Sequence, residues 1–242
     1  MTAPALPAGI CFDYGSTLVD FTRPVAAIAA AGEGLAGKLP LAGSAWKGTA
    51  GELAVALDLL LDRLVGEGHR KLGTREVDIE AIHQEAIEQL LGCALNPELS
   101  AEFGAALQRA WVAGANPVGP ALRVVNQLRE RGVRIGLCSN APYSPDLMYE
   151  QLDRLDLRRY FDAVVFSSEI GWRKPDPRIF SELLQRMGLP ASSVWFVGDD
   201  WEADIEGARG VGMQAILAPA GKAPVAAAAQ LSQWGDLVKR LG

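Results

Sequence analysis

The feature that most constrains this chain is an alternation of short apolar runs with helix-like segments, interrupted by one long helical block. The first apolar run covers residues 8–12, and four more follow at 133–138, 163–166, 194–197 and 214–217. Runs of this length between helices are typical of parallel strands, because a crossover helix must connect each strand to the next. The pattern therefore predicts an α/β fold in which helices cover both faces of a parallel sheet.

The helical block covers about residues 22–117 and is rich in Ala, Leu and Glu. Apolar residues recur there at helical spacing, which predicts about four helices, at 25–35, 52–65, 76–91 and 97–113, and no strand. We therefore predict two domains. Residues 1–20 and 118–242 form the α/β core domain, and residues 21–117 form an all-helical cap domain inserted after the first strand.

Composition excludes several classes of function. Lys and Arg number 23 against 29 Asp and Glu, so the net charge is −6, which has the wrong sign for a surface that binds nucleic acid. No apolar stretch is long enough for a membrane helix, and the first residues do not resemble a signal peptide, so we expect a cytoplasmic protein without a membrane partner. With only two histidines, an all-histidine zinc site is excluded.

Polar residues follow the predicted strands at the points where chemistry is expected in such a fold. Ligands of parallel sheets bind outside the carboxyl ends of the strands. The residues at these ends are Asp13, the pair Ser139 and Asn140, and the pair Asp199 and Asp200, with Asp204 on the next helix and Lys174 in a loop before another helix. Carboxylates that converge on one crevice need a cation, and hard oxygen ligands suit Mg²⁺. Together with hydroxyl, amide and ammonium donors they indicate phosphoryl transfer.

These residues resemble the four ordered motifs of the haloacid dehalogenase superfamily, and the helical insert is similar to the cap of its subclass I members. The resemblance covers nearly the whole chain and implies a Rossmann-like parallel sheet core. The matching segments are residues 12–18, 137–140, 173–180 and 197–200 with Asp204.

The resemblance also implies roles for single residues. Asp13 is the expected nucleophile, which becomes an aspartyl-phosphate, and Thr17 bonds near it. Ser139 and Lys174 are the expected phosphate ligands, and Asn140 either joins them or orients the loop. The expected Mg²⁺ ligands are Asp13, the backbone carbonyl of Gly15, Asp199, Asp200 and Asp204. The spacing leaves open whether Asp200 or Asp204 instead caps the following helix.

Gly15 is the main departure from the family pattern, because most phosphatases of this superfamily carry an aspartate there that protonates the leaving oxygen and activates water. Glycine can do neither, and a general acid or base contributes a factor of about 10² to 10⁴ in rate. Three outcomes are compatible with this change: a leaving group that departs unprotonated, a proton donor elsewhere, or phosphate binding without catalysis.

The sequence thus predicts a Mg²⁺-dependent hydrolase that acts on a small phosphorylated metabolite, with slow turnover. Three alternatives stay open: a non-catalytic phosphate-binding or interaction protein on the same scaffold, a dehalogenase, and a phosphonate-cleaving enzyme. Nothing in the sequence indicates the substrate or the oligomeric state.

Overall fold

The computed structural model describes residues 6–222 and 230–240. The chain divides into two compact units. The core unit consists of Met1–Phe21, Asn116–Ala141 and Leu155–Gly242, and the helical unit consists of Thr22–Ala115 and Pro142–Arg154. The domain boundaries predicted above stay predictions. They differ from this division by one or two residues at the ends of the insert, since Phe21, Asn116 and Pro117 group with the core unit, and more substantially in that Pro142–Arg154 groups with the helical unit.

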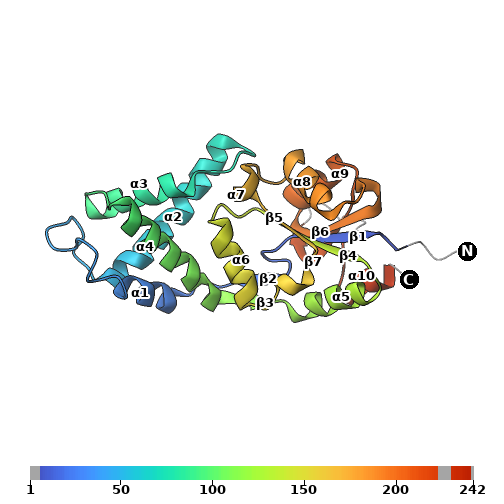
Figure 1. The fold of residues 1–242 in the computed structure, drawn as a ribbon, viewed down its shortest axis with the longest axis horizontal. Helices are drawn as coiled ribbons and strands as arrows, with labels where there is room; N and C mark the ends of the chain where they lie inside the picture. The colour runs from blue at the N-terminus through green and yellow to red at the C-terminus, as the bar shows by residue number, and fades with distance from the viewer. Residues whose placement is uncertain (1–5, 223–229, 241–242) are drawn as a thin grey trace, which may run out of the picture. The chain divides into compact units, whose positions relative to one another are not determined.

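The core unit is built on five parallel strands in the order β5-β4-β1-β6-β7 (Figure 1). Phe12 at the end of the central strand pairs with Leu137 on one side and Val197 on the other. This register brings the carboxyl ends of β1, β4 and β6 to one edge of the sheet and confirms the predicted parallel α/β fold. The strands are β1 (Gly9–Phe12), β4 (Arg134–Ser139), β5 (Ala163–Phe166), β6 (Val194–Asp200) and β7 (Gln214–Lys222).

Helices pack on this sheet through apolar side chains. The buried face of α8 places Phe180 edge-on against Phe196 of β6, with the ring centroids 5.3 Å apart. Burying side chains of this size contributes about 1.5–3 kcal/mol each, which holds the sheet edge rigid. The helices are α5 (Gly119–Glu130), η2 (Arg158–Tyr160), α7 (Ser167–Ile170), α8 (Pro177–Met187), η3 (Ala191–Ser193), the π-helix η4 (Trp201–Glu206), α9 (Gly207–Gly210) and α10 (Gly235–Arg240).

The helical unit has its own apolar core, which includes Leu53, Leu57, Ile87 and Phe103. Two of its helices begin at strong N-caps: a Thr49–Glu52 capping box starts α2, and Asn96 caps α4. Among the described residues, no helix is both long and apolar enough to cross a bilayer. The elements are α1 (Val25–Glu33), α2 (Ala50–Leu72), α3 (Ile79–Leu91), α4 (Pro97–Ala110), η1 (Trp111–Gly114) and α6 (Pro145–Arg154).

Side-chain contacts explain why α6 belongs to the helical unit. The Gln108 amide of α4 donates to the Ser144 carbonyl at 3.4 Å, and Arg109 pairs with Glu150 of α6 at 3.0 Å. The helix alternates with strands along the chain, as the helices of the core do, so its membership in either unit depends on these long-range contacts.

Two short strands, β2 (Val19–Phe21) and β3 (Ala115–Pro117), pair with each other in a separate sheet. The prediction that residues 22–117 contain no strand is wrong for β3. A three-residue strand of sequence Ala-Asn-Pro shows no alternation of apolar and polar residues, so its pattern could not indicate a strand.

Candidate active site

The turn after β1 positions the predicted nucleophile. The Asp13 N–H donates to the Val197 carbonyl at 2.9 Å, which holds Asp13 at the carboxyl edge of the sheet. The Tyr14 carbonyl then accepts from the N–H groups of Leu18 and Val19, at 2.9 and 3.0 Å, and closes the turn. Thr17 lies within this turn, so its side chain is fixed relative to Asp13.

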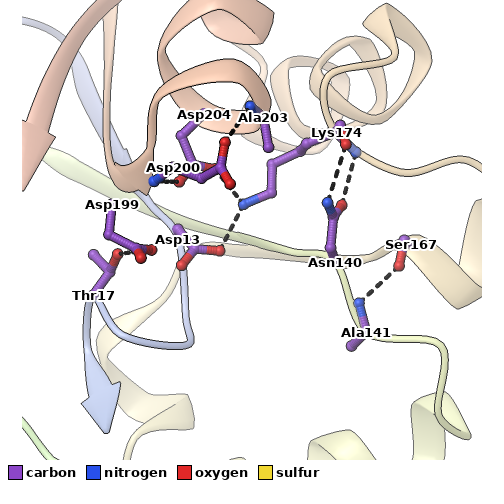
Figure 2. A network of polar contacts seen from close by, with 10 residues as sticks. All are labelled: Asp13, Thr17, Asn140, Ala141, Ser167, Lys174, Asp199, Asp200, Ala203 and Asp204. Atoms are coloured by element: carbon purple, nitrogen blue, oxygen red, sulfur yellow. Dashed lines mark hydrogen bonds and ion pairs between the residues drawn. The ribbon is translucent and has the colours of Figure 1, made fainter. Parts of the chain in front are cut away.

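Three carboxylates converge at this edge. Asp13, Asp199 and Asp204 each offer an oxygen, and these oxygens lie within 4.8 Å of one another (Figure 2). Asp13 is 7% exposed and Asp204 1% exposed. The Thr17 hydroxyl donates to Asp199 Oδ1 at 3.2 Å, which links the turn after β1 to the end of β6. The structure therefore brings together residues from the turn after β1, from β6 and from η4.

Lys174 reaches the same cluster from the loop before α8. Its Nζ lies 2.6 Å from Asp13 Oδ1 and 2.6 Å from Asp204 Oδ1, and the residue is 4% exposed. The Asn140 side chain holds the backbone of this residue on both sides. Its Nδ2 donates to the Lys174 carbonyl at 3.0 Å, and its Oδ1 accepts from the Lys174 N–H at 2.7 Å.

The charges of the cluster are incompletely balanced. Burial raises the pKa of Asp13, Lys174 opposes this increase, and Asp199 adds to it. Burial also raises the pKa of Asp204, again against the effect of Lys174. For Lys174, burial favours the neutral amine, but Asp13 and Asp204 outweigh it and raise its pKa. Three carboxylates facing one ammonium carry a net negative charge that a further cation would neutralise.

The donor set fits Mg²⁺. Three carboxylates offer hard oxygen ligands without a histidine or cysteine, and oxygen ligands of this kind are those that Mg²⁺ prefers. Asp13, Asp199 and Asp204 would hold the ion. The predicted contribution of the Gly15 carbonyl stays a prediction.

Asp200 is placed differently from the other predicted ligands. It is exposed, and its Oδ1 accepts from the Ala203 N–H at 2.7 Å, so its side chain caps η4. Asp204 instead accepts from the Asp200 N–H at 3.0 Å with Oδ2 and from Lys174 with Oδ1. Asp200 thus caps the helix and lies outside the three-carboxylate cluster, and its predicted role as a Mg²⁺ ligand stays a prediction.

Ser139 ends β4, next to the strand that carries Asp13. It is buried at the carboxyl end of the strand, where its hydroxyl is of the right kind to donate to an oxyanion. One contact was absent from the sequence interpretation: Ser167 Oγ accepts from the Ala141 N–H at 2.8 Å. Ser167 follows β5 directly, so the strand-end criterion that singled out the other residues applies to it as well.

The family follows from a comparison with known proteins. A family model described as haloacid dehalogenase-like hydrolase matches residues 7–212. The chain belongs to this family. A glyceraldehyde 3-phosphate phosphatase of Methanopyrus kandleri is 31% identical over 140 residues, which cover 58% of this chain and 59% of the relative. A phosphoserine phosphatase of Thermus thermophilus is 33% identical over 146 residues, 60% of this chain and 56% of the relative. The chain thus spans under two thirds of the length of these relatives.

Solved structures support the fold over nearly the whole length. A 2-haloacid dehalogenase from Pseudomonas syringae pv. Tomato DC3000 has a TM-score of 0.66 at 23% identity, covering 96% of both chains. A HAD phosphatase from Thermococcus onnurineus has a TM-score of 0.63 at 21% identity, covering 97% of both. Two different activities share this architecture, so the fold alone does not choose between them.

Proposed function

We propose that this haloacid dehalogenase-like hydrolase is a Mg²⁺-dependent phosphatase that hydrolyses a small phosphomonoester through an aspartyl-phosphate on Asp13. The observation that carries the proposal is the contact of one ammonium, Lys174 Nζ, at 2.6 Å with both Asp13 and Asp204, within a three-carboxylate cluster. The phosphatase names of the relatives above favour a phosphate ester as the substrate.

Asp13 suits the role of nucleophile through its position. Lys174 Nζ donates to Oδ1, and no other side chain of residues 6–222 and 230–240 hydrogen-bonds to Oδ2, which is therefore able to attack phosphorus. The buried turn after β1 holds the carboxylate rigidly, which lowers the entropic cost of reaching the reactive geometry. A covalent aspartyl-phosphate divides one difficult displacement into two easier steps.

Other side chains would stabilise the charge on the transferring group. Lys174 lies next to Asp13, where its ammonium would offset the negative charge of the transferring group, and the Ser139 hydroxyl would donate to a phosphoryl oxygen. Asp13, Asp199 and Asp204 would hold Mg²⁺, with the Gly15 carbonyl as a further ligand. When bound, Mg²⁺ polarises phosphoryl oxygens and offsets their negative charge.

The proposal is tested with Asp13→Asn, which keeps the size of the side chain and removes the nucleophile. We expect hydrolysis of p-nitrophenyl phosphate to fall by at least about 10³-fold, because the covalent step is lost. In the wild type, chelation of Mg²⁺ abolishes turnover, and rapid-quench labelling detects phosphoenzyme, since Gly15 provides no base for the second step.

Asp156→Asn is the matched control. Asp156 is exposed and has a φ of 55°, a conformation that asparagine also adopts readily, so the same change of charge leaves activity unaltered. Unchanged turnover in Asp13→Asn would contradict the proposal. Tight binding of a phosphomonoester without turnover or phosphoenzyme in the wild type would instead support the non-catalytic alternative.

A further inference from the structure

The turn that carries Asp13 also fixes Gly15 relative to Phe21. The Ser16 N–H donates to the Val19 carbonyl at 2.8 Å, and Gly15 and Val19 form an isolated β-bridge. The Leu18 carbonyl accepts from the Val118 N–H at 2.8 Å, which ties the turn to the next segment of the core unit. Phe21 ends β2, two residues after this bridge. Gly15 and Phe21 therefore belong to one hydrogen-bonded structure.

The space around position 15 would accommodate a side chain, so packing does not require a glycine there. Among the described residues other than its chain neighbours, only Phe21 comes within 4 Å of a Cβ built on Gly15, with two ring carbons at 3.9 and 4.0 Å. These are ordinary van der Waals distances, and φ at Gly15 is not in the left-handed region. Gly198 differs, since a Cβ there would lie 2.2 Å from Asp204 Oδ2. The space beside Gly15 is therefore open, and the wall that faces it is an aromatic ring.

Phe21 is one of the few large apolar side chains of the described residues that stay exposed, at 38%. Its ring packs against buried Tyr14 in an edge-to-face arrangement, with centroids 5.6 Å apart and an interplanar angle of 68°. Tyr14 lies between Asp13 and Gly15 in the chain, so the ring is held against the segment that carries the nucleophile. A planar apolar group that covered Phe21 would remove apolar surface from water and could stack on the ring.

Position 15 lies between Asp13, which belongs to the carboxylate cluster, and Thr17, whose hydroxyl donates to Asp199 of that cluster at 3.2 Å. A family member with aspartate at this position has a proton donor for the leaving oxygen, whereas this chain has an open space beside Phe21. A leaving group at this place receives no proton from residue 15, so one that is stable as an anion departs more readily than one that needs protonation.

We infer that Gly15 and Phe21 form the leaving-group subsite and select phosphate esters whose leaving group is planar, apolar and a stable anion, as in aryl phosphates. This inference rests on the proposed phosphatase function. Asp13 attacks phosphorus, the bond from phosphorus to the aryl oxygen breaks, and its electron pair leaves with the aryloxide, which takes a proton from bulk water. Water then attacks the phosphoenzyme, the bond to Asp13 breaks with return of its electron pair, and the proton of the water passes to solvent.

The test separates acidity of the leaving group from its shape. Hydrolysis is measured for a series of substituted phenyl phosphates, for an alkyl phosphate, and for a fluorinated alkyl phosphate whose alcohol is as acidic as one of the phenols. For the wild type, we expect kcat/KM to rise steeply with acidity and to favour the phenyl ester over the equally acidic fluoroalkyl ester by about tenfold, the size of one aromatic contact. Comparable kcat/KM for alkyl and aryl esters would overturn the inference.

Variants assign the two effects to the two residues. Phe21→Leu keeps an apolar side chain and is expected to lose the preference for the phenyl over the fluoroalkyl ester, whereas Phe21→Tyr keeps it. Gly15→Asp is expected to raise the rate on the alkyl phosphate by about 10² or more and to flatten the dependence on acidity. Leu59→Ala removes another exposed apolar side chain, on α2, and serves as the control that changes neither property.

The outcomes distinguish this inference from the function on which it depends. The inference would be overturned if Phe21→Leu lowered kcat/KM equally for the phenyl and the fluoroalkyl ester at an unchanged melting temperature. Phe21 would then only support the turn. In that case, the proposed phosphatase function would still hold as long as turnover requires Asp13 and Mg²⁺. Absence of both turnover and phosphoenzyme for every ester would refute the phosphatase itself.

Discussion

At the scale of single residues, Asn140 uses both hydrogen-bonding functions of its side-chain amide on the backbone of one residue, Lys174. Its amide donates to the carbonyl of Lys174 and accepts from the N–H of the same residue, at 3.0 and 2.7 Å. Both the donor and the acceptor of the amide are therefore occupied by the backbone of Lys174, whose ammonium is the one proposed to act in catalysis. A residue that positions another in this way affects turnover more than substrate binding.

Asn140→Asp tests this role with almost no change in volume. A carboxylate still accepts from the Lys174 N–H but cannot donate to its carbonyl, so the two oxygens repel each other and displace the loop. We expect kcat to fall by about 10 to 100-fold with a much smaller change in KM, because a small misplacement of a catalytic group is costly. Steady-state kinetics with p-nitrophenyl phosphate measures this.

Asn96→Asp is the control for the same chemical change. Asn96 caps α4 by accepting from the Leu99 N–H at 2.8 Å, and aspartate serves equally well as an N-cap. Its kinetics are expected to match the wild type. A rise in KM at constant kcat for Asn140→Asp would show that Asn140 binds the substrate directly.

At the scale of elements, the corner from β6 into the π-helix η4 brings Asp204 back to the strand end. Asp204 Oδ2 accepts from the Asp200 N–H at 3.0 Å and lies against the backbone of Gly198, where no side chain intervenes. Single π-helical turns of this kind often occur at functional sites. The close approach requires glycine at position 198, because any Cβ would occupy the place of the carboxylate.

Gly198→Ala is therefore expected to displace Asp204 from the cluster. The variant loses affinity for Mg²⁺ in calorimetric titration, and its kcat falls by at least about 10²-fold. The overlap also lowers the free energy of unfolding by about 1–3 kcal/mol. Gly210→Ala is the matched control, because nothing lies within 4 Å of a Cβ built there. Wild-type affinity for Mg²⁺ in Gly198→Ala would show that Asp204 is dispensable for the ion.

At the scale of the whole molecule, the fold could be predicted from the sequence further than the site could. Alternation of apolar runs with helices identified β1, β4, β5, β6 and β7 because burial on both faces leaves a continuous apolar run in each strand. The membership of α6 in the helical unit and the pairing of β2 with β3 depend on contacts between distant segments, which no local pattern contains.

For the site, the strand ends indicated which residues converge but not what each side chain does there. Asp200 and Asp204 lie one helical turn apart and are equivalent in the sequence, and only the π-helical corner separates the cap from the cluster residue. The contact of Asn140 with Lys174 joins residues 34 positions apart. The ring of Phe21 beside Gly15 depends on the turn between them.

The stability of the helical unit supplies a prediction about pH. His83 of α3 is 6% exposed, its Nδ1 lies 3.3 Å from Ser100 Oγ, and its Nε2 has no partner among the described residues. Burial lowers the pKa of His83 to about 4. The unfolded chain, with an ordinary pKa near 6.5, therefore takes up a proton at a higher pH than the folded unit does.

The sign of the effect follows from this difference. Above pH about 6.5 the histidine is neutral in both states, so its contribution to stability is complete there. As the pH falls from about 6.5 to about 4, protonation favours the unfolded chain, and up to about 3 kcal/mol of stability is lost, since each pKa unit corresponds to about 1.4 kcal/mol.

In His83→Phe, which keeps a ring against Phe103, this loss disappears. Urea unfolding at pH 7 and pH 4 measures this loss in the variant and in the wild type. Phe103→Leu is the control, because it alters the same packing and leaves His83 in place. It is expected to lose as much stability between the two pH values as the wild type does. If His83→Phe lost as much free energy of unfolding between pH 7 and pH 4 as the wild type, His83 would take up its proton in the folded unit as readily as in the unfolded chain. Other groups would then be responsible for the acid sensitivity.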